Sequence, residues 1–163
     1  MKKLLFVLPI IIFTLCSCTK KSPDVTAVAT GLSFTAEIKQ GKKDYVYDVV
    51  IDKNGAMTLK SQDDKKLSFY FCGNTLNKRY DDIEFSSTVS SVAKNDTCDL
   101  LFDVFSDVKT NRSIYTKNNR YYQKGETQKY SYTLHITKSG IPLKLEESRF
   151  GITVLFKKAN LQT

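Results

Sequence analysis

In the stretch Leu32-Ser33-Phe34-Thr35-Ala36-Glu37-Ile38-Lys39, apolar and polar side chains alternate without interruption. Successive side chains of a β-strand point to opposite faces, so this alternation predicts a strand with one buried and one solvated face. Strands of this kind are typical of an antiparallel sheet that packs on one side only. We therefore expect a mainly β domain, and the neighbouring segments extend the same pattern.

The segment that follows predicts a returning strand. Gln40-Gly41-Lys42 has the composition of a turn, and Asp44 and Asp48 fall on the polar face of the next strand. Four residues share its apolar face: Tyr45, Tyr47, Val49 and Ile51.

Asn54-Gly55 then separates this strand from a run that contains Met57 and Leu59. Both central residues of a type I′ turn need a positive φ, and Asn-Gly is the pair that satisfies this most often. We expect a two-residue hairpin turn at this position.

The remaining segments predict a meander of short antiparallel strands joined by polar turns. Strands are expected at 67–72, 83–85, 113–116, 120–123, 128–137, 143–145 and 152–156. Turns are expected at Asn118-Asn119, at Lys124-Gly125-Glu126 and at 138–142. Asn74–Tyr80 is expected to be irregular, and 86–94 is either a loop or a further strand.

The period changes after Asp96, where apolar residues recur at helical spacing. The apolar face consists of Leu100, Leu101, Val104, Phe105 and Val108. The opposite face, expected to meet solvent, consists of Asp99, Asp103, Ser106 and Asp107. Asp96 is suited to be the N-cap and Lys109 lies near the carboxyl end, so the pattern predicts one helix over residues 97–109.

The first residues resemble a bacterial lipoprotein signal. Lys2 and Lys3 precede an apolar run over 4–15, which is too short for the ~20 residues of a membrane span. Leu15-Cys16-Ser17-Cys18 resembles a lipobox, in which the final Cys becomes the lipidated N-terminus; Cys16, one register earlier, is the alternative. We expect a signal peptide at 1–17, the lipidated Cys18 and a flexible tether at 18–29, and one domain at 30–163. The chain would then be lipid-anchored on the extracytoplasmic side of a membrane of the bacterial cell envelope.

The charge of the chain is positive, at +8 formally and +6 without Lys2 and Lys3. Such a surplus favours anionic lipid headgroups or acidic wall polymers, although acids between the paired lysines indicate a solvated, mixed-sign surface. No basic helix or arginine–aromatic ladder of a nucleic-acid reader is present.

Few residues are suited to catalysis or metal binding. His135 is the only histidine and alternates with the apolar face of its strand, which indicates a surface position. We expect no metal site, no cofactor and no enzymatic activity, because motifs for nucleophilic, phosphate-binding or zinc chemistry are lacking. Beyond the signal region, Cys72 and Cys98 either form one disulfide or remain two buried thiols.

The closing part of the chain resembles the C-terminal hairpin of the LolA-like superfamily. The resemblance rests on the alternating segment Tyr130–Glu147, with its Gly140-Ile141-Pro142 turn, and on the last strand over 152–161. This superfamily includes lipoprotein carriers, envelope-stress sensor domains and lipid-anchored relatives such as the GerS lipoproteins. The resemblance implies an α+β fold in which an antiparallel β half-barrel wraps around one substantial helix.

The resemblance also implies an apolar concave face. The residues expected to line it are Phe34, Tyr45, Tyr47, Phe69, Phe71, Leu101, Phe105 and Tyr132. They either form an open groove for an acyl chain or lipidated peptide, or a fully packed core. In the second case the protein would dock an envelope protein, as a scaffold or regulator of a cell-wall enzyme. A hydrolase with an unfamiliar site is the remaining alternative.

Overall fold

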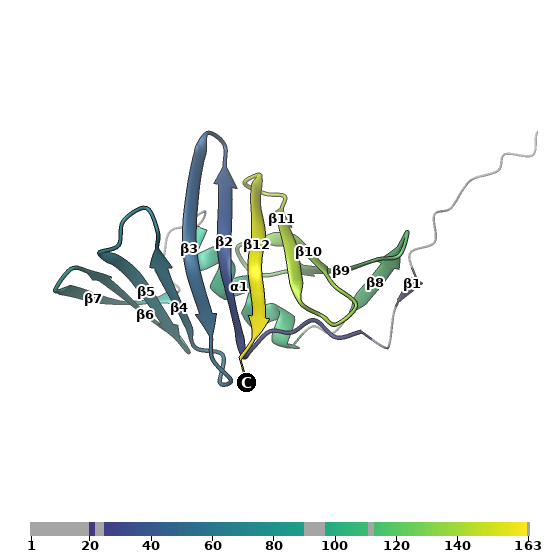
Figure 1. Ribbon diagram of the computed structural model, residues 1–163, viewed down its shortest axis with the longest axis horizontal. Coiled ribbons are helices and arrows are strands. Elements are labelled where there is room, and N and C mark those ends of the chain that lie inside the picture. Colours follow the sequence, from purple (N-terminus) through teal and green to yellow (C-terminus); the bar gives the residue numbers. More distant parts are fainter. Residues whose placement is uncertain (1–19, 22–24, 90–96, 111–112, 163) are drawn as a thin grey trace, which may run out of the picture.

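The computed structural model describes residues 20–21, 25–89, 97–110 and 113–162. In these ranges the chain forms twelve strands and one α-helix, α1 (Thr97–Thr110) (Figure 1). The strands are β1 (Lys20–Lys21), β2 (Leu32–Gln40), β3 (Lys43–Ile51), β4 (Met57–Ser61), β5 (Leu67–Cys72), β6 (Thr75–Tyr80), β7 (Ile83–Thr88), β8 (Ile114–Lys117), β9 (Arg120–Glu126), β10 (Ser131–Ile136), β11 (Pro142–Glu147) and β12 (Ile152–Leu161).

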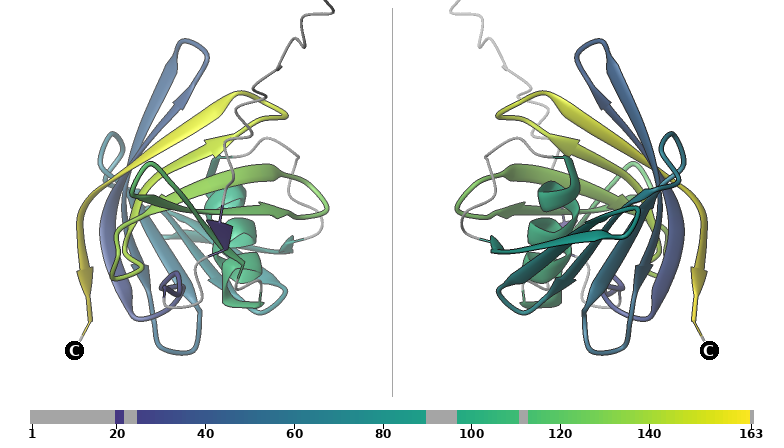
Figure 2. Two further views of the ribbon diagram at one scale, coloured as in Figure 1. Left: turned by 90° about the vertical axis from the view of Figure 1, so that its right-hand side faces the viewer. Right: turned by 90° about the vertical axis from the view of Figure 1, so that its left-hand side faces the viewer.

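All strands belong to one open antiparallel sheet in the order β1-β8-β9-β10-β11-β12-β2-β3-β4-β5-β6-β7. Neighbours in sequence are mostly neighbours in the sheet, as the meander pattern predicts. Two pairings are exceptions: β1 pairs with β8, and β12, the last described strand, pairs with β2 near the start of the domain, with Leu161 opposite Leu32. The helix packs on one face of this sheet (Figure 2). The expectation of a mainly β fold with one helix is confirmed.

The alternation of the central strands places their apolar side chains in the core. In β2, Leu32, Ala36 and Ile38 are fully buried, and Phe34 retains 4% exposure. The predicted faces of β10 and β12 are also buried, and so is that of β3 except for the half-buried Tyr45. A helix packed over one face explains why the pattern has period two, since the other face remains in contact with solvent.

The helix lies where its periodicity predicts, one residue longer at its carboxyl end. Its aromatic residues pack against three strands, because the Phe105 ring stacks on Phe34 at 5.6 Å and meets Phe156 at 5.9 Å. The Phe102 ring stacks on Phe71 of β5 at 4.8 Å. The proposed N-cap, Asp96, lies outside the described residues.

The expected two-residue hairpin turn does not form at Asn54-Gly55, whereas the turn expected at Asn118-Asn119 has the positive φ values of type I′. Asn54 does not have a positive φ, and a longer connection over 52–56 joins β3 to β4. There the Asp52 carboxylate accepts the backbone N–H groups of Asn54 and Ala56 at 2.8 and 2.9 Å. Asn118 and Asn119, with φ of 52° and 58°, form the two-residue turn between β8 and β9. The side chain of Asp52 therefore overrides the preference of Asn-Gly.

Two segments are strands where the sequence pattern indicates none. The segment expected to be irregular is β6, whose one buried apolar residue, Leu76, gives too weak an alternation to recognise. The predicted turn at 124–126 is wrong, because β9 continues to Glu126 and the chain turns after Thr127. This position inside the strand requires glycine, because a Cβ at Gly125 would overlap the Tyr132 phenol and the Asp107 carboxylate.

The segment before β2 contributes to the domain. Val25 and Ala27, expected in the flexible tether, are 5% and 8% exposed and belong to the core. The Val28 N–H donates to the Gly140 carbonyl at 2.9 Å. Further toward the amino end, β1 pairs with β8 at the sheet edge. The signal region and Cys18 lie outside the described residues.

Candidate functional site

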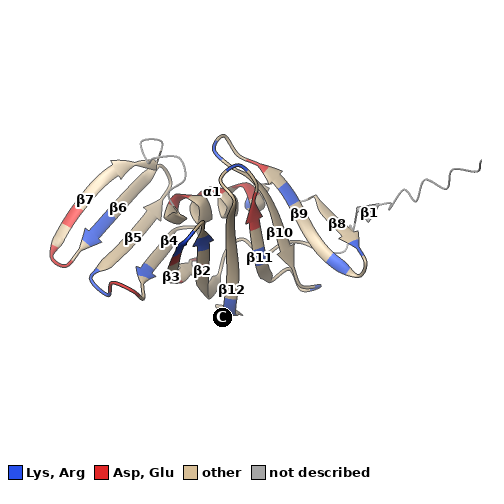
Figure 3. Ribbon diagram, turned by 90° about the horizontal axis from the view of Figure 1, so that it is seen from above, with Lys and Arg blue, Asp and Glu red and all other residues tan. Residues whose placement is uncertain are grey.

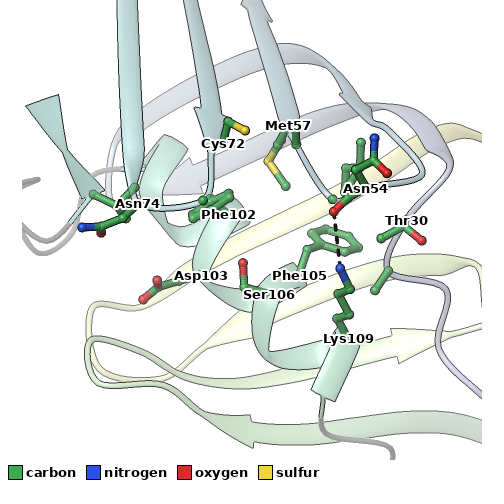
Figure 4. A pocket seen from close by; sticks show the side chains of 16 residues that line it. Thr30, Asn54, Met57, Cys72, Asn74, Phe102, Asp103, Phe105, Ser106 and Lys109 are labelled. Atoms are coloured by element: carbon green, nitrogen blue, oxygen red, sulfur yellow. Dashed lines mark hydrogen bonds between the residues drawn. The ribbon is translucent and has the colours of Figure 1, made fainter. Parts of the chain in front are cut away.

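A pocket of about 460 Å³ opens between α1 and the ends of β3 to β6 (Figure 4). Its apolar part is formed by Ile51, Met57, Val89, Phe102 and Phe105. Its polar part is formed mainly by Thr30, Asn54, Asn74, Asp103, Ser106 and Lys109. A volume of this size falls in the range of small-molecule sites, which combine apolar walls with a few polar groups.

Lys109 is the cation of this pocket. It comes from the last turn of α1, and its ammonium donates to the Asn54 carbonyl at 3.3 Å (Figure 4). The loop at 52–56, held by Asp52, presents that carbonyl. Gly55 has a φ of 93°, so the loop requires a residue without a side chain at this position.

The residues expected to line an open groove are instead packed against one another. Seven of the eight are buried, with exposures from 0% for Phe71 and Leu101 to 7% for Phe69, and Tyr45 is half-buried. Phe105 alone of this set lines the pocket. The aromatic face therefore belongs to the core, and the open volume lies at its end, where polar residues that the alternation did not indicate join Ile51 and Met57.

The acidic face of α1 does not point to solvent, which corrects the expectation from its periodicity. Asp99 is fully buried and pairs with Lys129 at 2.8 Å, while the Tyr130 hydroxyl donates to the same oxygen at 3.2 Å. Thr127 donates to Asp103 at 3.2 Å, and Tyr132 donates to Asp107. These three acids stand four residues apart and bind the helix to β10 and to the turn before it.

Burial controls the ionisation of this face. Desolvation raises the pKa of the Asp99 carboxyl above its ordinary value, against the lowering effect of Lys129. Desolvation likewise raises the pKa of Asp103. The pKa of the Tyr132 phenol is raised by burial and by its hydrogen bond to Asp107, so this hydroxyl remains a donor.

Cys72 and Cys98 are not bridged to each other. Cys72 is exposed on β5 and lines the pocket, whereas Cys98 is buried in the first turn of α1. The alternative of a disulfide between them is therefore wrong for this structure, and Cys98 alone is a buried thiol.

His135 lies on the solvated face of β10, where its Nε2 is 3.0 Å from Glu146. The described ranges contain no cluster of three or more His, Cys, Asp or Glu residues suited to a metal ion. They also contain no helix with the length and hydropathy of a membrane span.

A second surface feature is the exposed apolar edge at β7. Tyr80, Ile83 and Phe85 are 44%, 58% and 59% exposed. Their register places them on the same face as the buried Phe69 and Phe71, since Phe85 lies opposite Lys78 and Lys78 opposite Phe69. The apolar face of the sheet thus continues beyond the part that α1 covers, onto a strand whose outer edge pairs with no other described strand.

Comparison with known proteins identifies no relative: no protein-family model matches the chain, and no curated protein is significantly similar to it.

Proposed function

We propose that this chain is a non-enzymatic lipoprotein of the bacterial cell envelope that binds an acyl chain in the pocket beside α1. The observation that carries the proposal is the pocket of about 460 Å³ with an aromatic wall and, among the described residues that line it, one cation, Lys109, at its rim. An acyl chain would lie against the apolar wall of the pocket, and Lys109 would attract an anionic head.

We also propose that the sheet is a LolA-like half-barrel around α1. Support comes from the two sides of the helix, which contact Phe71 on β5 and Tyr132 on β10. Six strand spacings separate β10 from β5 in the sheet order, about 29 Å if the sheet were flat. A helix is only ~10 Å across, so these contacts favour a sheet that bends around it.

The acyl-chain proposal is tested by photocrosslinking with a diazirine fatty acid on the full chain in its own membranes. We expect labelled peptides from α1 near Phe102 and Phe105. Ser106→Trp should abolish labelling by filling the pocket, and Ser106→Ala is the matched control that leaves the pocket open. Equal labelling of the two variants would contradict binding at this position.

The membrane anchor in this proposal is supported by the lipobox pattern at Cys18. Cys18→Ala should remove the incorporation of a metabolic fatty-acid probe and leave the chain uncleaved or released from the membrane. Stable anchoring needs more than one acyl chain, and a lipidated N-terminal Cys supplies it. Label retained in Cys18→Ala and lost in Cys16→Ala would move the anchor to the other cysteine.

A second candidate function, docking of an envelope protein, is favoured by the exposed Tyr80, Ile83 and Phe85. Exposed apolar surface beside an unpaired strand edge is suited to an added strand from a partner. A photoreactive amino acid in place of Phe85 should crosslink one protein in cells. The same group in place of Val50, which is 40% exposed on the other face, is the control. Identical crosslinks from both positions would remove the support for this surface.

A further inference from the structure

The sheet end opposite to β7 carries a row of aromatic and basic side chains on its outer face. Tyr115, Tyr122, His135 and Lys144 lie directly opposite one another across β8, β9, β10 and β11. Directly opposed residues share a face, and the adjacent Leu134 is fully buried on the helix side. The row therefore belongs to the face that α1 does not cover.

Ring contacts connect three members of this row. The Tyr115 and Tyr122 rings stack at 5.8 Å with an interplanar angle of 22°, and His135 lies 6.4 Å from Tyr122. As a result Tyr122 is only 9% exposed although it stands on the outer face. The basic residues therefore lie around a platform formed by these three rings.

Two adjoining hollows of about 360 and 770 Å³ lie over this platform and share Arg120 and His135. Their cations are Lys117, Arg120, Lys138 and Lys144, against one carboxylate, Glu146. Glu146 is engaged by Lys144 and His135. Lys117, Arg120 and Lys138 form no ion pair within the described part of the chain. Figure 3 shows basic segments along β9 and at the end of β8.

The anchor leaves the domain at this same end. The backbone of β1 pairs with β8, with Lys21 opposite Tyr115. Cys18 stands two residues before Lys20, a distance of at most ~7 Å in an extended chain. If Cys18 is lipidated, as the proposed function requires, β8 lies within about one Debye length of the membrane surface.

We propose that this outer face of β8 to β11 is a membrane-facing surface that binds the phosphate headgroups of anionic lipids. Lys117, Arg120 and Lys138 contact the phosphates, and Leu143, which is 49% exposed between Lys138 and Lys144, enters the interface. The surface fixes the orientation of the tethered domain, with the pocket beside α1 on the opposite face of the sheet. The proposal rests on the proposed anchor for the proximity of the bilayer.

The test uses the absence of tryptophan from the sequence. Tyr115→Trp places a single fluorophore in the surface and retains the stacked ring, and Tyr70→Trp places one on β5, where Tyr70 is 43% exposed. The full chain is reconstituted into vesicles containing brominated phosphatidylglycerol or brominated phosphatidylcholine. We expect quenching at position 115 in the anionic vesicles, and little quenching at position 70 or in the zwitterionic vesicles.

Charge reversal provides the second measurement. Lys117→Glu with Arg120→Glu should lower the population of the membrane-facing orientation by at least about 25-fold, at about fivefold for each basic residue near the surface. Lys42→Glu with Lys65→Glu, two exposed lysines elsewhere, makes the same change of net charge and should leave quenching unchanged.

The outcomes separate the surface from its anchor. Quenching that is equal in anionic and zwitterionic vesicles, or that is unchanged by charge reversal of Lys117 and Arg120, would contradict the proposed surface. An equal loss of quenching in the Lys42 and Lys65 control variant would also contradict it. Fatty-acid labelling of Cys18 is followed in the same samples. Labelling of Cys18 without quenching at position 115 would support the anchor and contradict the membrane-facing surface. Quenching without labelling would support the surface and contradict the anchor. Saturable binding of inorganic phosphate to this surface in the absence of anionic lipid would identify a soluble anion as its ligand. That result would overturn the proposal.

Discussion

At the scale of single residues, loss of the ion pair between Asp99 and Lys129 is expected to have the largest effect on the free energy of unfolding. The side chain of Asp99 is 0% exposed and that of Lys129 is 13% exposed. Asp99 Oδ1 has no hydrogen-bond partner among the described residues, so the carboxylate depends on Lys129 and Tyr130. Lys129→Met should lower the free energy of unfolding by about 3–5 kcal/mol at neutral pH, since it leaves a buried charge uncompensated. Urea melts measure this, with exposed Lys65→Met as the control. A loss equal to that of the control would mean that Asp99 is not ionised.

The pH dependence of stability follows from the raised pKa values of Asp99 and Asp103. A carboxyl whose folded-state pKa lies above its unfolded value of 3.8 binds its proton more tightly in the folded protein. Its contribution to stability is complete below that unfolded value and is lost as the pH rises through the folded pKa. Wild type should therefore gain stability relative to Asp103→Asn as the pH falls from neutral toward 3.8. Parallel urea melts of both proteins across this window measure the gain, and a constant difference would contradict it.

Substitutions of Gly125 and Gly41 test two different reasons why a position requires glycine, a close contact and a positive φ. At Gly125 an added methyl group meets the Tyr132 ring and Asp107, whereas no atom lies within 4 Å of the corresponding position at Gly41. Gly41→Ala should cost only the ~1–2 kcal/mol of a left-handed backbone, since its φ is 61°. Gly125→Ala should cost more, because β9, β10 and α1 must all shift. Thermal melts that rank the two in the opposite order would contradict the close approach.

At the scale of elements, α1 is fixed to the sheet by aromatic contacts on one side and by acids on the other. Leu101→Ala and Phe105→Ala should each lower the free energy of unfolding by roughly 2–5 kcal/mol, because both side chains are almost fully buried. Ser106→Ala, on the exposed part of the helix, should change it by less than about 0.5 kcal/mol. Similar losses at all three positions in urea melts would contradict this packing.

The sequence predicts best those elements in which the apolar positions coincide with the face that is buried in the fold. Phe34, Ala36 and Ile38 alternate because β2 has one covered face, and Leu101 and Phe105 repeat at helical spacing because α1 has a buried side. The prediction that Asp99, Asp103 and Asp107 meet solvent is wrong, because helical periodicity shows only which residues are polar and which are apolar. It cannot show that Lys129, Thr127 and Tyr132, distant in sequence, bring partners to the polar side. The pocket was missed for a similar reason, since Asn54 and Lys109 meet only through tertiary packing.

At the scale of the whole molecule, strand order divides the sheet into two halves. One half runs from β2 to β7, the other consists of β1 and β8 to β11, and β12 is the strand that joins them. A chain ending at Gly151 should therefore lose cooperative unfolding. Circular dichroism and urea melts measure this, and a chain shortened only by Gln162 and Thr163 is the control. Retention of one sharp transition without β12 would contradict this role.

The position of β12 also determines when the protein can fold. Strand β12, which joins the two halves, is synthesised after the other described strands, and its partner β2 is among the first. Until it arrives, the pairing of Leu32 with Leu161 is missing and the centre of the sheet has an open edge. Pairing over so long a separation is slow, because the loop must close before the contact is made. In an exported chain, which the proposed function requires, this delay would keep the polypeptide unfolded until β12 is available.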